Sequence, residues 1–185
     1  MFHVEQKKEM DKMDLKSYIR EVPDFPQPGI GFKDITTLIG DAGAFGVMVD
    51  RITRHYRNRG ITKVVSLESR GFIVGGALAY LLQAGFVPIR KAGKLPAQTI
   101  SMSYELEYGT DTIEIHADAL GEDDTVLIHD DLLATGGTAL AALHLVQKLG
   151  VKKIYFSFIC DLQFIHTPLK EELKAYVPHI LVSYP

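Results

Sequence analysis

One stretch of the chain, Val126–Leu149, restricts the possible folds more than any other. Three apolar residues with high strand propensity, Val126–Ile128, are followed within two residues by the acidic pair Asp130 and Asp131. A short loop with two glycines comes next, and apolar residues then recur at helical spacing as far as Leu149. A buried strand, a polar loop and an amphipathic helix in this order are typical of α/β proteins, whose ligands bind at the carboxyl ends of parallel strands.

The loop in this stretch has the composition of a phosphate-binding turn; its residues are Ala134, Thr135, Gly136, Gly137 and Thr138. Backbone N–H groups at a helix N-terminus bind anions, and glycines let the main chain approach a phosphate without a Cβ in the way. The acidic pair before the loop is suited to two vicinal hydroxyls, or to hydroxyls and a metal shell. Phosphate on one side and a diol on the other indicate a ribose 5-phosphate, in preference to a solvated acidic turn. No Gly-Lys-Ser/Thr follows the glycines and the third glycine of a dinucleotide loop is absent, which excludes both of those sites.

The rest of the chain repeats the alternation of strands and helices. Helices are expected from Leu15 to Val22, at Phe45–Tyr56, Val74–Leu82, Thr138–Leu149 and Leu169–Tyr176, and strands at Lys63–Leu67, Phe86–Arg90, Val126–Ile128, Ile154–Ile159 and Ile180–Ser183. Strict alternation of polar and apolar residues between Thr99 and His116 predicts a hairpin with one polar face. We therefore expect one domain, 1–185, of the α/β class. It has a mainly parallel sheet flanked by helices, a β-hairpin flap at 97–117 and a flexible extension at 1–12.

Composition narrows the function. The net charge of −3 argues against nucleic acid as a partner, because binding to the phosphate backbone leaves a basic footprint. The first ten residues lack the apolar core of a signal peptide. Residues Phe72–Ile89 are apolar enough to be weighed as a membrane span, but their glycines and Pro88 favour a helix followed by a strand. The single Cys160 excludes an internal disulfide and favours the reducing cytoplasm.

The segment Val126–Thr138 resembles the PRPP signature of the phosphoribosyltransferases. Further segments, in order along the chain, resemble the adenine phosphoribosyltransferases from about Leu15 to Leu149; they are Val22–Pro26 with Pro28–Thr36, Glu68–Phe72, Pro88–Pro96 and Tyr104–Gly109. The resemblance implies a Rossmann-like fold and transfer of the phosphoribosyl group of PRPP to adenine, giving AMP and pyrophosphate. It also implies Mg²⁺ as the cofactor and a homodimer.

The resemblance also implies a role for each matching residue. The residues that would bind the 5-phosphate of PRPP and AMP are Ala134, Thr135, Gly136, Gly137 and Thr138. Those that would bind pyrophosphate are Glu68, Ser69, Arg70, Arg90, Lys91 and Lys94. Those that would bind adenine are Ile30, Gly31, Phe32 and Lys33. Adenine would be read by the carbonyl of Gly31 and the N–H of Lys33. Glu107, at the tip of the hairpin beside Tyr108, is the candidate acid or base at purine N7. Asp130 and Asp131 would hold the ribose hydroxyls, and Mg²⁺ would be held mainly by PRPP and water near them.

The chain departs from the family pattern at several positions. His129 stands where Val, Ile or Thr is usual, Gly31 and Lys33 replace a bulkier apolar residue and Arg, and residues 161–168 differ from the usual acidic, glycine-containing run. Two alternatives stay open at this point. One is the same chemistry on a 6-oxopurine or xanthine, and the other is a PRPP-sensing regulator that binds nucleic acid.

Overall fold

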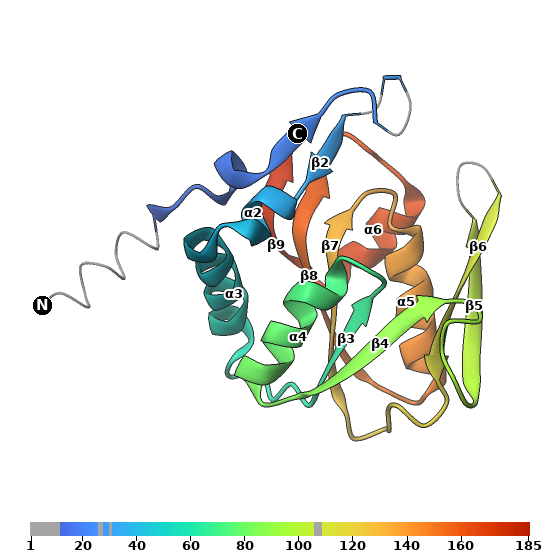
Figure 1. Ribbon diagram of the computed structural model, residues 1–185. Coiled ribbons are helices and arrows are strands. Elements are labelled where there is room, and N and C mark those ends of the chain that lie inside the picture. The colour runs from blue at the N-terminus through green and yellow to red at the C-terminus, as the bar shows by residue number, and fades with distance from the viewer. Residues whose placement is uncertain (1–11, 26–27, 30, 106–108) are drawn as a thin grey trace, which may run out of the picture. The chain divides into compact units, whose positions relative to one another are not determined.

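The computed structural model describes residues 12–25, 28–29, 31–105 and 109–185 (Figure 1). The chain divides into two compact units, residues 1–51 and 52–185. Apart from Lys12, the N-terminal extension lies outside the described residues.

The first unit contains short elements. They are a 3₁₀ turn η1 (Leu15–Tyr18), strands β1 (Arg20–Val22) and β2 (Phe32–Asp34), helix α2 (Thr36–Gly40) and most of helix α3 (Ala42–Tyr56). The expected helix from Leu15 to Val22 is therefore wrong, because it is replaced by the 3₁₀ turn and β1, which pairs antiparallel with β2. The helical spacing covered only eight residues before Pro23, too few to stabilise an isolated helix.

The second unit is built around a seven-stranded sheet in the order β5-β6-β4-β3-β7-β8-β9 (Figure 1). The strands are β3 (Lys63–Leu67), β4 (Gly85–Lys91), β5 (Thr99–Glu105), β6 (Thr110–His116), β7 (Thr125–Leu133), β8 (Lys153–Leu162) and β9 (His179–Tyr184). The five strands β4, β3, β7, β8 and β9 each run parallel to the next, whereas β5 and β6 form an antiparallel hairpin. The hairpin joins the sheet through antiparallel pairing of β6 with β4. The flap predicted at 97–117 is thus the edge of the central sheet.

Helices cover both faces of this sheet. Helices α5 (Gly137–Lys148) and α6 (Pro168–Lys174) bury apolar side chains in a cluster with alternate residues of the strands, such as Val65 and Leu67. Helix α4 (Gly71–Leu82) covers the opposite face, where a Cβ on Gly75 would lie 1.9 Å from Ser66 Oγ. Gly75 is therefore required for this close approach of helix and strand.

Most elements lie where the sequence predicts them, and the mainly parallel sheet flanked by helices is confirmed. Strand β7 is longer than expected and carries Asp130 and Asp131 within it. The apolar stretch Phe72–Ile89 is divided between α4 and β4, as the glycines and proline predict. Among the described residues, every helix is too short or too polar to span a membrane.

Candidate active site

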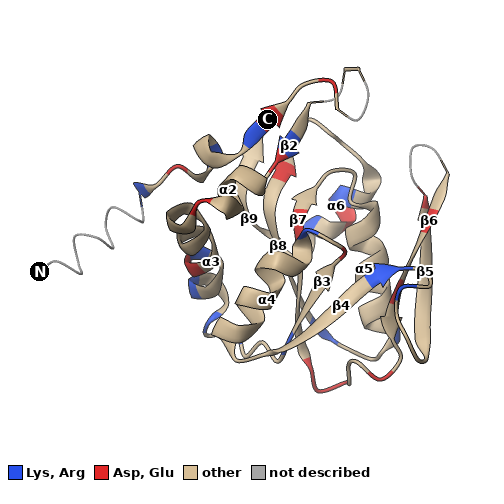
Figure 2. Cartoon of the chain, in the orientation of Figure 1, with Lys and Arg blue, Asp and Glu red and all other residues tan. Residues whose placement is uncertain are grey.

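Three neighbouring strands of the second unit bring the predicted polar residues to one edge. Strands β4, β3 and β7 are adjacent and parallel, so their carboxyl ends meet. Figure 2 shows basic residues at the tip of β4 and acidic residues toward the end of β7. The sequence-predicted residues from 68 to 70, at 90, 91 and 94, and from 130 to 138 therefore come from one edge of one sheet.

The acidic pair is held by backbone and by charge. Arg70 Nε donates to Asp131 Oδ2 across the edge between β3 and β7, forming an ion pair with a buried carboxylate. Asp130 Oδ1 accepts the N–H of Asp131 at 2.9 Å. Burial raises the pKa of Asp130 well above its ordinary value, although some of the residue is accessible to solvent, and the neighbouring Asp131 carboxylate adds to the shift. The two carboxylates therefore differ, with Asp131 charge-paired and Asp130 a weaker acid than an exposed aspartate.

Glu68 organises the basic cluster. Its carboxylate accepts two hydrogen bonds from Arg90, at 3.1 and 3.2 Å, and a third from the N–H of Lys91 at 3.0 Å. The hydrogen bond from Arg90 lowers the pKa of Glu68 despite its partial burial. Arg90 Nη1 also donates to the carbonyl of Lys94 at 3.2 Å, which closes the loop after β4. The peptide bond between Glu68 and Ser69 is cis.

Two residues of the flap hairpin reach the same edge, and sequence reasoning missed both. Lys91 Nζ lies 3.0 Å from Asp111 Oδ2 on β6, and this pairing raises the pKa of Lys91 and lowers that of Asp111. Tyr104 on β5 packs on the phosphate loop, because a Cβ on Gly137 would lie 3.3 Å from Tyr104 Cδ2. Burial raises the pKa of Tyr104, and a hydrogen bond with Thr138 opposes the shift. The two residues are register partners on the apolar face of the hairpin, where Asp111 is a polar residue in line with Ile113 and Ile115, and this break in the alternation is the signal that could have identified it.

The glycines of the phosphate loop meet different neighbours. Gly136 has φ of +90°, a conformation that favours glycine, and a Cβ there would lie 3.2 Å from the backbone nitrogen of Lys170. The side of Gly136 on which another residue would carry its Cβ therefore lies against α6. The N–H of Gly137, which begins α5, lies 3.5 Å from Thr135 Oγ1. Backbone conformation and packing therefore require glycine at position 136, whereas at position 137 a Cβ would make a tight contact with Tyr104.

The residues predicted to bind adenine lie in the first unit. Phe32 and Lys33 belong to β2, so the expected extended backbone is confirmed for these two, and Gly31 directly precedes the strand. Lys33 Nζ pairs with Glu21 Oε1 at 2.7 Å, and the Phe32 ring meets Phe25 edge to face at 5.2 Å.

Three predicted residues, Ile30, Glu107 and Tyr108, lie outside the described residues. Among all the residues that the structure describes, no group of three or more His, Cys, Asp or Glu side chains is arranged to hold a metal ion.

His129, the departure before the acidic pair, is fully buried in β7. Its register neighbours on both sides are serines, Ser66 on β3 and Ser157 on β8. Within the described part of the chain, the polar atoms of all three side chains lack a hydrogen-bond partner of good geometry. Burial lowers the pKa of His129 to about 3, and the backbone of Ser157 opposes only part of this shift. The imidazole is therefore neutral at physiological pH.

This histidine makes the fold sensitive to acid. An unfolded chain protonates His129 near its ordinary pKa of 6.5, whereas the folded chain does so only near 3, so stability falls as pH drops between these values. The slope reaches about 1.4 kcal/mol per pH unit. We expect His129→Val to lose roughly 2 kcal/mol less stability than the wild type between pH 6.5 and 5 in urea unfolding. His166→Gln, at an exposed position, is the control. Equal pH dependence in wild type and His129→Val would contradict the prediction.

Comparison with known proteins places this arrangement in a family. A model of the phosphoribosyl transferase domain matches residues 39–166. The chain is 57% identical over 172 residues to the adenine phosphoribosyltransferase of Maricaulis maris, covering 93% of this chain and 98% of that protein. The crystal structure of adenine phosphoribosyltransferase from Rhodothermus marinus superposes with a TM-score of 0.86 at 47% identity, covering 96% of this chain and 99% of that one.

The corresponding enzyme from Giardia lamblia, solved with 9-deazaadenine, gives a TM-score of 0.87 at 39% identity, covering 93% of this chain and 97% of that one. The fold agrees with that of these relatives, and the sequence identity extends over nearly the whole chain. The chain therefore belongs to the adenine phosphoribosyltransferase family, with the type I phosphoribosyltransferase fold.

Proposed function

We propose that the edge formed by β4, β3 and β7 is the PRPP site of an enzyme that makes AMP and pyrophosphate from adenine and PRPP. The reaction is that of the family, a pentosyl transfer. The observation that carries the proposal is the Arg70–Asp131 pair beside the phosphate loop, since it places a fixed guanidinium next to the proposed sugar-binding carboxylates. The experiment that tests the proposal is competition between adenine and hypoxanthine for PRPP.

The leaving pyrophosphate is assigned to the basic cluster. Arg70, Arg90 and Lys94 stabilise its developing negative charge, and the backbone of Glu68 and Ser69 lines the same loop. The Glu68 carboxylate holds Arg90 in place, as its two hydrogen bonds support. Lys91 is paired with Asp111, so its release toward pyrophosphate would require the flap to exchange partners.

The sugar and the 5-phosphate fix the reacting carbon. Residues 134–138 bind the 5-phosphate at the start of α5 and so anchor C1′. Asp130 and Asp131 hold O2′ and O3′ and stabilise the positive charge that develops on the ribose ring. Adenine N9 attacks C1′ as the bond to pyrophosphate breaks. Glu107 moves the proton at N7, and Tyr108 beside it closes the flap so that water is excluded.

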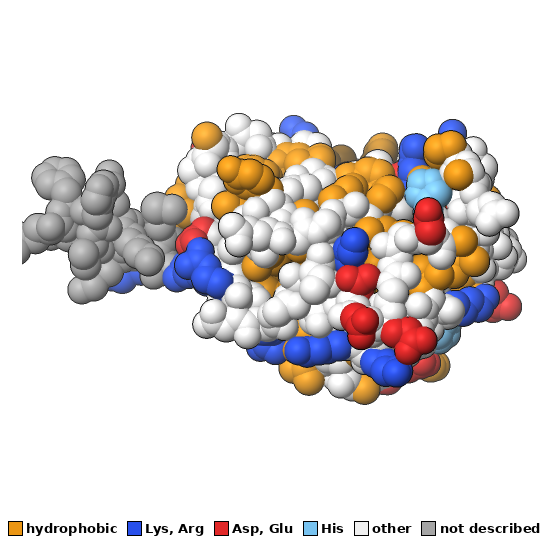
Figure 3. Space-filling view, turned by 90° about the horizontal axis from the view of Figure 1, so that it is seen from below, with side chains coloured by type: hydrophobic (Ala, Val, Ile, Leu, Met, Phe, Trp, Pro, Cys, Tyr) orange, Lys and Arg blue, Asp and Glu red, His pale blue; other side chains and the backbone are white. Residues whose placement is uncertain are grey.

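Adenine is assigned to Ile30, Gly31, Phe32 and Lys33. The solved structure of the Giardia lamblia relative with 9-deazaadenine supports adenine as the base for this chain, in preference to a 6-oxopurine or xanthine. A regulator that binds nucleic acid is disfavoured by the net charge of −3. On the face shown in Figure 3, acidic and basic side chains lie close together among apolar ones, unlike a basic stripe.

Mg²⁺ is the proposed cofactor, and the donors present fit it. Within the described part of the chain, Asp130 and Asp131 are the carboxylates proposed to lie near the sugar, and Asp131 is already engaged by Arg70. Mg²⁺ commonly keeps several waters and binds through one or two carboxylates and substrate phosphates. Bound in this way, it would neutralise pyrophosphate charge as the bond to C1′ breaks.

Removal of the metal is expected to abolish turnover. Treatment with excess EDTA should lower AMP formation to background, because the leaving group then keeps its full charge, and added Mg²⁺ or Mn²⁺ should restore it. The measurement is AMP formation by chromatography before and after metal addition. Undiminished turnover in EDTA would show that the reaction does not require Mg²⁺.

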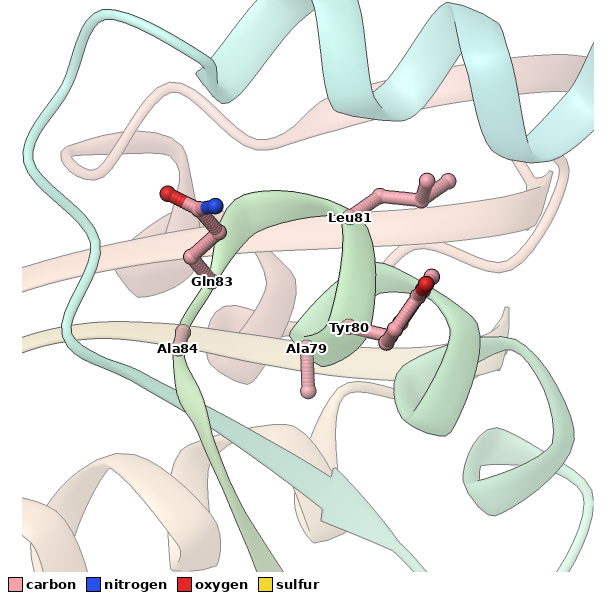
Figure 4. Close-up of a pocket in the computed structure, with 5 residues that line it drawn as sticks. All are labelled: Ala79, Tyr80, Leu81, Gln83 and Ala84. Carbon is pink, nitrogen blue, oxygen red and sulfur yellow. The ribbon is translucent and has the colours of Figure 1, made fainter.

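A homodimer is also proposed, with α4 in the interface. Its outward side chains Ile73, Tyr80 and Leu81 are 47, 82 and 48% exposed, an apolar patch that association would cover. Figure 4 shows Tyr80 and Leu81 beside a pocket of about 530 Å³ at the end of this helix. Sedimentation of the purified chain tests this, since a monomer at micromolar concentration would oppose it.

The family match at residues 39–166 crosses the boundary at 51 and 52 between the two units. We accordingly propose that 1–185 acts as one phosphoribosyltransferase domain. A cytoplasmic location is proposed because the sequence has a single cysteine, Cys160, and therefore no internal disulfide.

A further inference from the structure

We propose that Lys170 and Asp161 are positioning residues for the 5-phosphate loop: a buried ion pair that holds the loop from behind, on the side away from the ligand. The inference rests on the proposed function, because it concerns the loop assigned to the PRPP 5-phosphate. Neither residue is predicted from the sequence to act in the site, and both lie in or just after the segment 161–168 that departs from the family pattern.

The pair is buried and hydrogen-bonded. Lys170 is 9% exposed and Asp161 6% exposed. Lys170 Nζ donates to Asp161 Oδ1 at 2.6 Å and to the carbonyl of Leu162 at 2.7 Å. Asp161 lies near the end of β8, in register with Leu133, the last residue of β7 before the loop. The pair therefore lies at the level where the phosphate loop begins.

The stem of Lys170 and the start of α6 touch the loop directly. A Cβ on Gly136 would lie 3.2 Å from both Lys170 Cγ and Lys170 N, so the back of Gly136 rests on the first turn of α6. Thr167, which caps α6, donates from Oγ1 to the carbonyl of Thr135 at 2.5 Å and accepts the N–H of Lys170 at 3.2 Å. Two consecutive loop residues, Thr135 and Gly136, are thus fixed to α6.

The charges explain why this support is placed behind the loop. A lone lysine this close to a phosphate would be attracted toward it, whereas Asp161 neutralises Lys170 and keeps it in the interior. The loop then has its bound shape before the ligand arrives, and preorganisation of this kind increases affinity by reducing the ordering required on binding. Removing either partner leaves the other as an uncompensated buried charge, which α6 can relieve only by moving.

The test separates phosphate binding from other functions of the enzyme. Lys170→Met keeps the stem against Gly136 and removes the charge. It is expected to raise the Kd for ribose 5-phosphate, measured by calorimetry, by about tenfold or more, since displacements of about 1 Å cost up to about 10²-fold. The Kd for pyrophosphate should stay within about twofold, because its proposed ligands lie in the loop after β3 and at the end of β4. Lys170→Arg should recover most of the affinity for ribose 5-phosphate. The control is Lys174→Met, which removes the exposed lysine of α6 that pairs with Glu171.

A second variant guards against loss of the fold. Thr167→Val leaves the ion pair intact and removes the hydrogen bond to Thr135, and it should weaken ribose 5-phosphate binding in the same selective way. Folded Lys170→Met or Thr167→Val protein with wild-type affinity for ribose 5-phosphate would overturn the proposal. So would equal weakening of ribose 5-phosphate and pyrophosphate. Failure of the wild type itself to bind ribose 5-phosphate would instead refute the proposed function.

Discussion

Replacing Asp130 and Asp131 together by asparagine is expected to lower kcat/KM by about 10³-fold or more while the protein stays folded. Both side chains are proposed to hold the ribose hydroxyls and to stabilise the charge that develops on the ring. The amides keep the size of the carboxylates but not their charge. Of the single variants, Asp131→Asn should lose more activity, because its carboxylate also fixes Arg70. The measurement is steady-state AMP formation, with circular dichroism to verify the fold.

The matched control lies in the segment before β7, where Asp118 and Asp123 are exposed. The double variant Asp118→Asn with Asp123→Asn removes the same number of charges away from the site, and its activity should be that of the wild type. A folded Asp130→Asn, Asp131→Asn enzyme that keeps near wild-type kcat/KM would show that the acidic pair is not part of the site.

The elements of the second unit could be predicted because each pattern is local and strong. Lys63–Leu67 is a β-branched apolar run, and the structure has a strand at those residues. Strand β7 was predicted too short because charged residues normally mark the end of a strand. Here it continues to Leu133 because it stays paired with β8, and because Arg70 neutralises Asp131. Strand β1 could not be predicted, since it depends on pairing with β2 more than ten residues away.

The candidate site was predictable where its residues form contiguous motifs. The segment 134–138 carries glycines and threonines in a recognisable order, and the structure places it at the junction of β7 and α5, with Gly137 and Thr138 in the first turn of the helix. The contacts Lys91–Asp111 and Lys170–Asp161 join segments that are separate in the sequence, and a polar residue in a hairpin or at the end of a strand gives no sign of its partner. Pairing across the fold therefore had to be seen in three dimensions.

Selectivity for adenine is the other large expected effect. Adenine has a donor at N6 and an acceptor at N1, whereas hypoxanthine and guanine present an acceptor at O6 and a donor at N1. In an extended segment, the carbonyl of Gly31 and the N–H of Lys33 point to the same side because they are two residues apart. We propose that this pair reads the base. A 6-oxopurine would oppose like groups and leave buried polar atoms unpaired, which can discriminate by roughly 10⁴-fold.

Because the reading groups are main-chain atoms, Lys33→Ala should keep the preference for adenine even if overall activity falls. The variant loses the ion pair with Glu21 but not the backbone donor. A loss of the preference for adenine in this variant would show that the side chain of Lys33, and not its backbone N–H, recognises the base.

Competition between adenine and hypoxanthine for PRPP, with AMP and IMP quantified in the same reaction, decides whether adenine is the substrate. We predict a kcat/KM for adenine roughly 10⁴-fold above that for hypoxanthine. Comparable values for the two bases would contradict the assignment of adenine as the substrate, and absence of both nucleotides would contradict phosphoribosyl transfer itself.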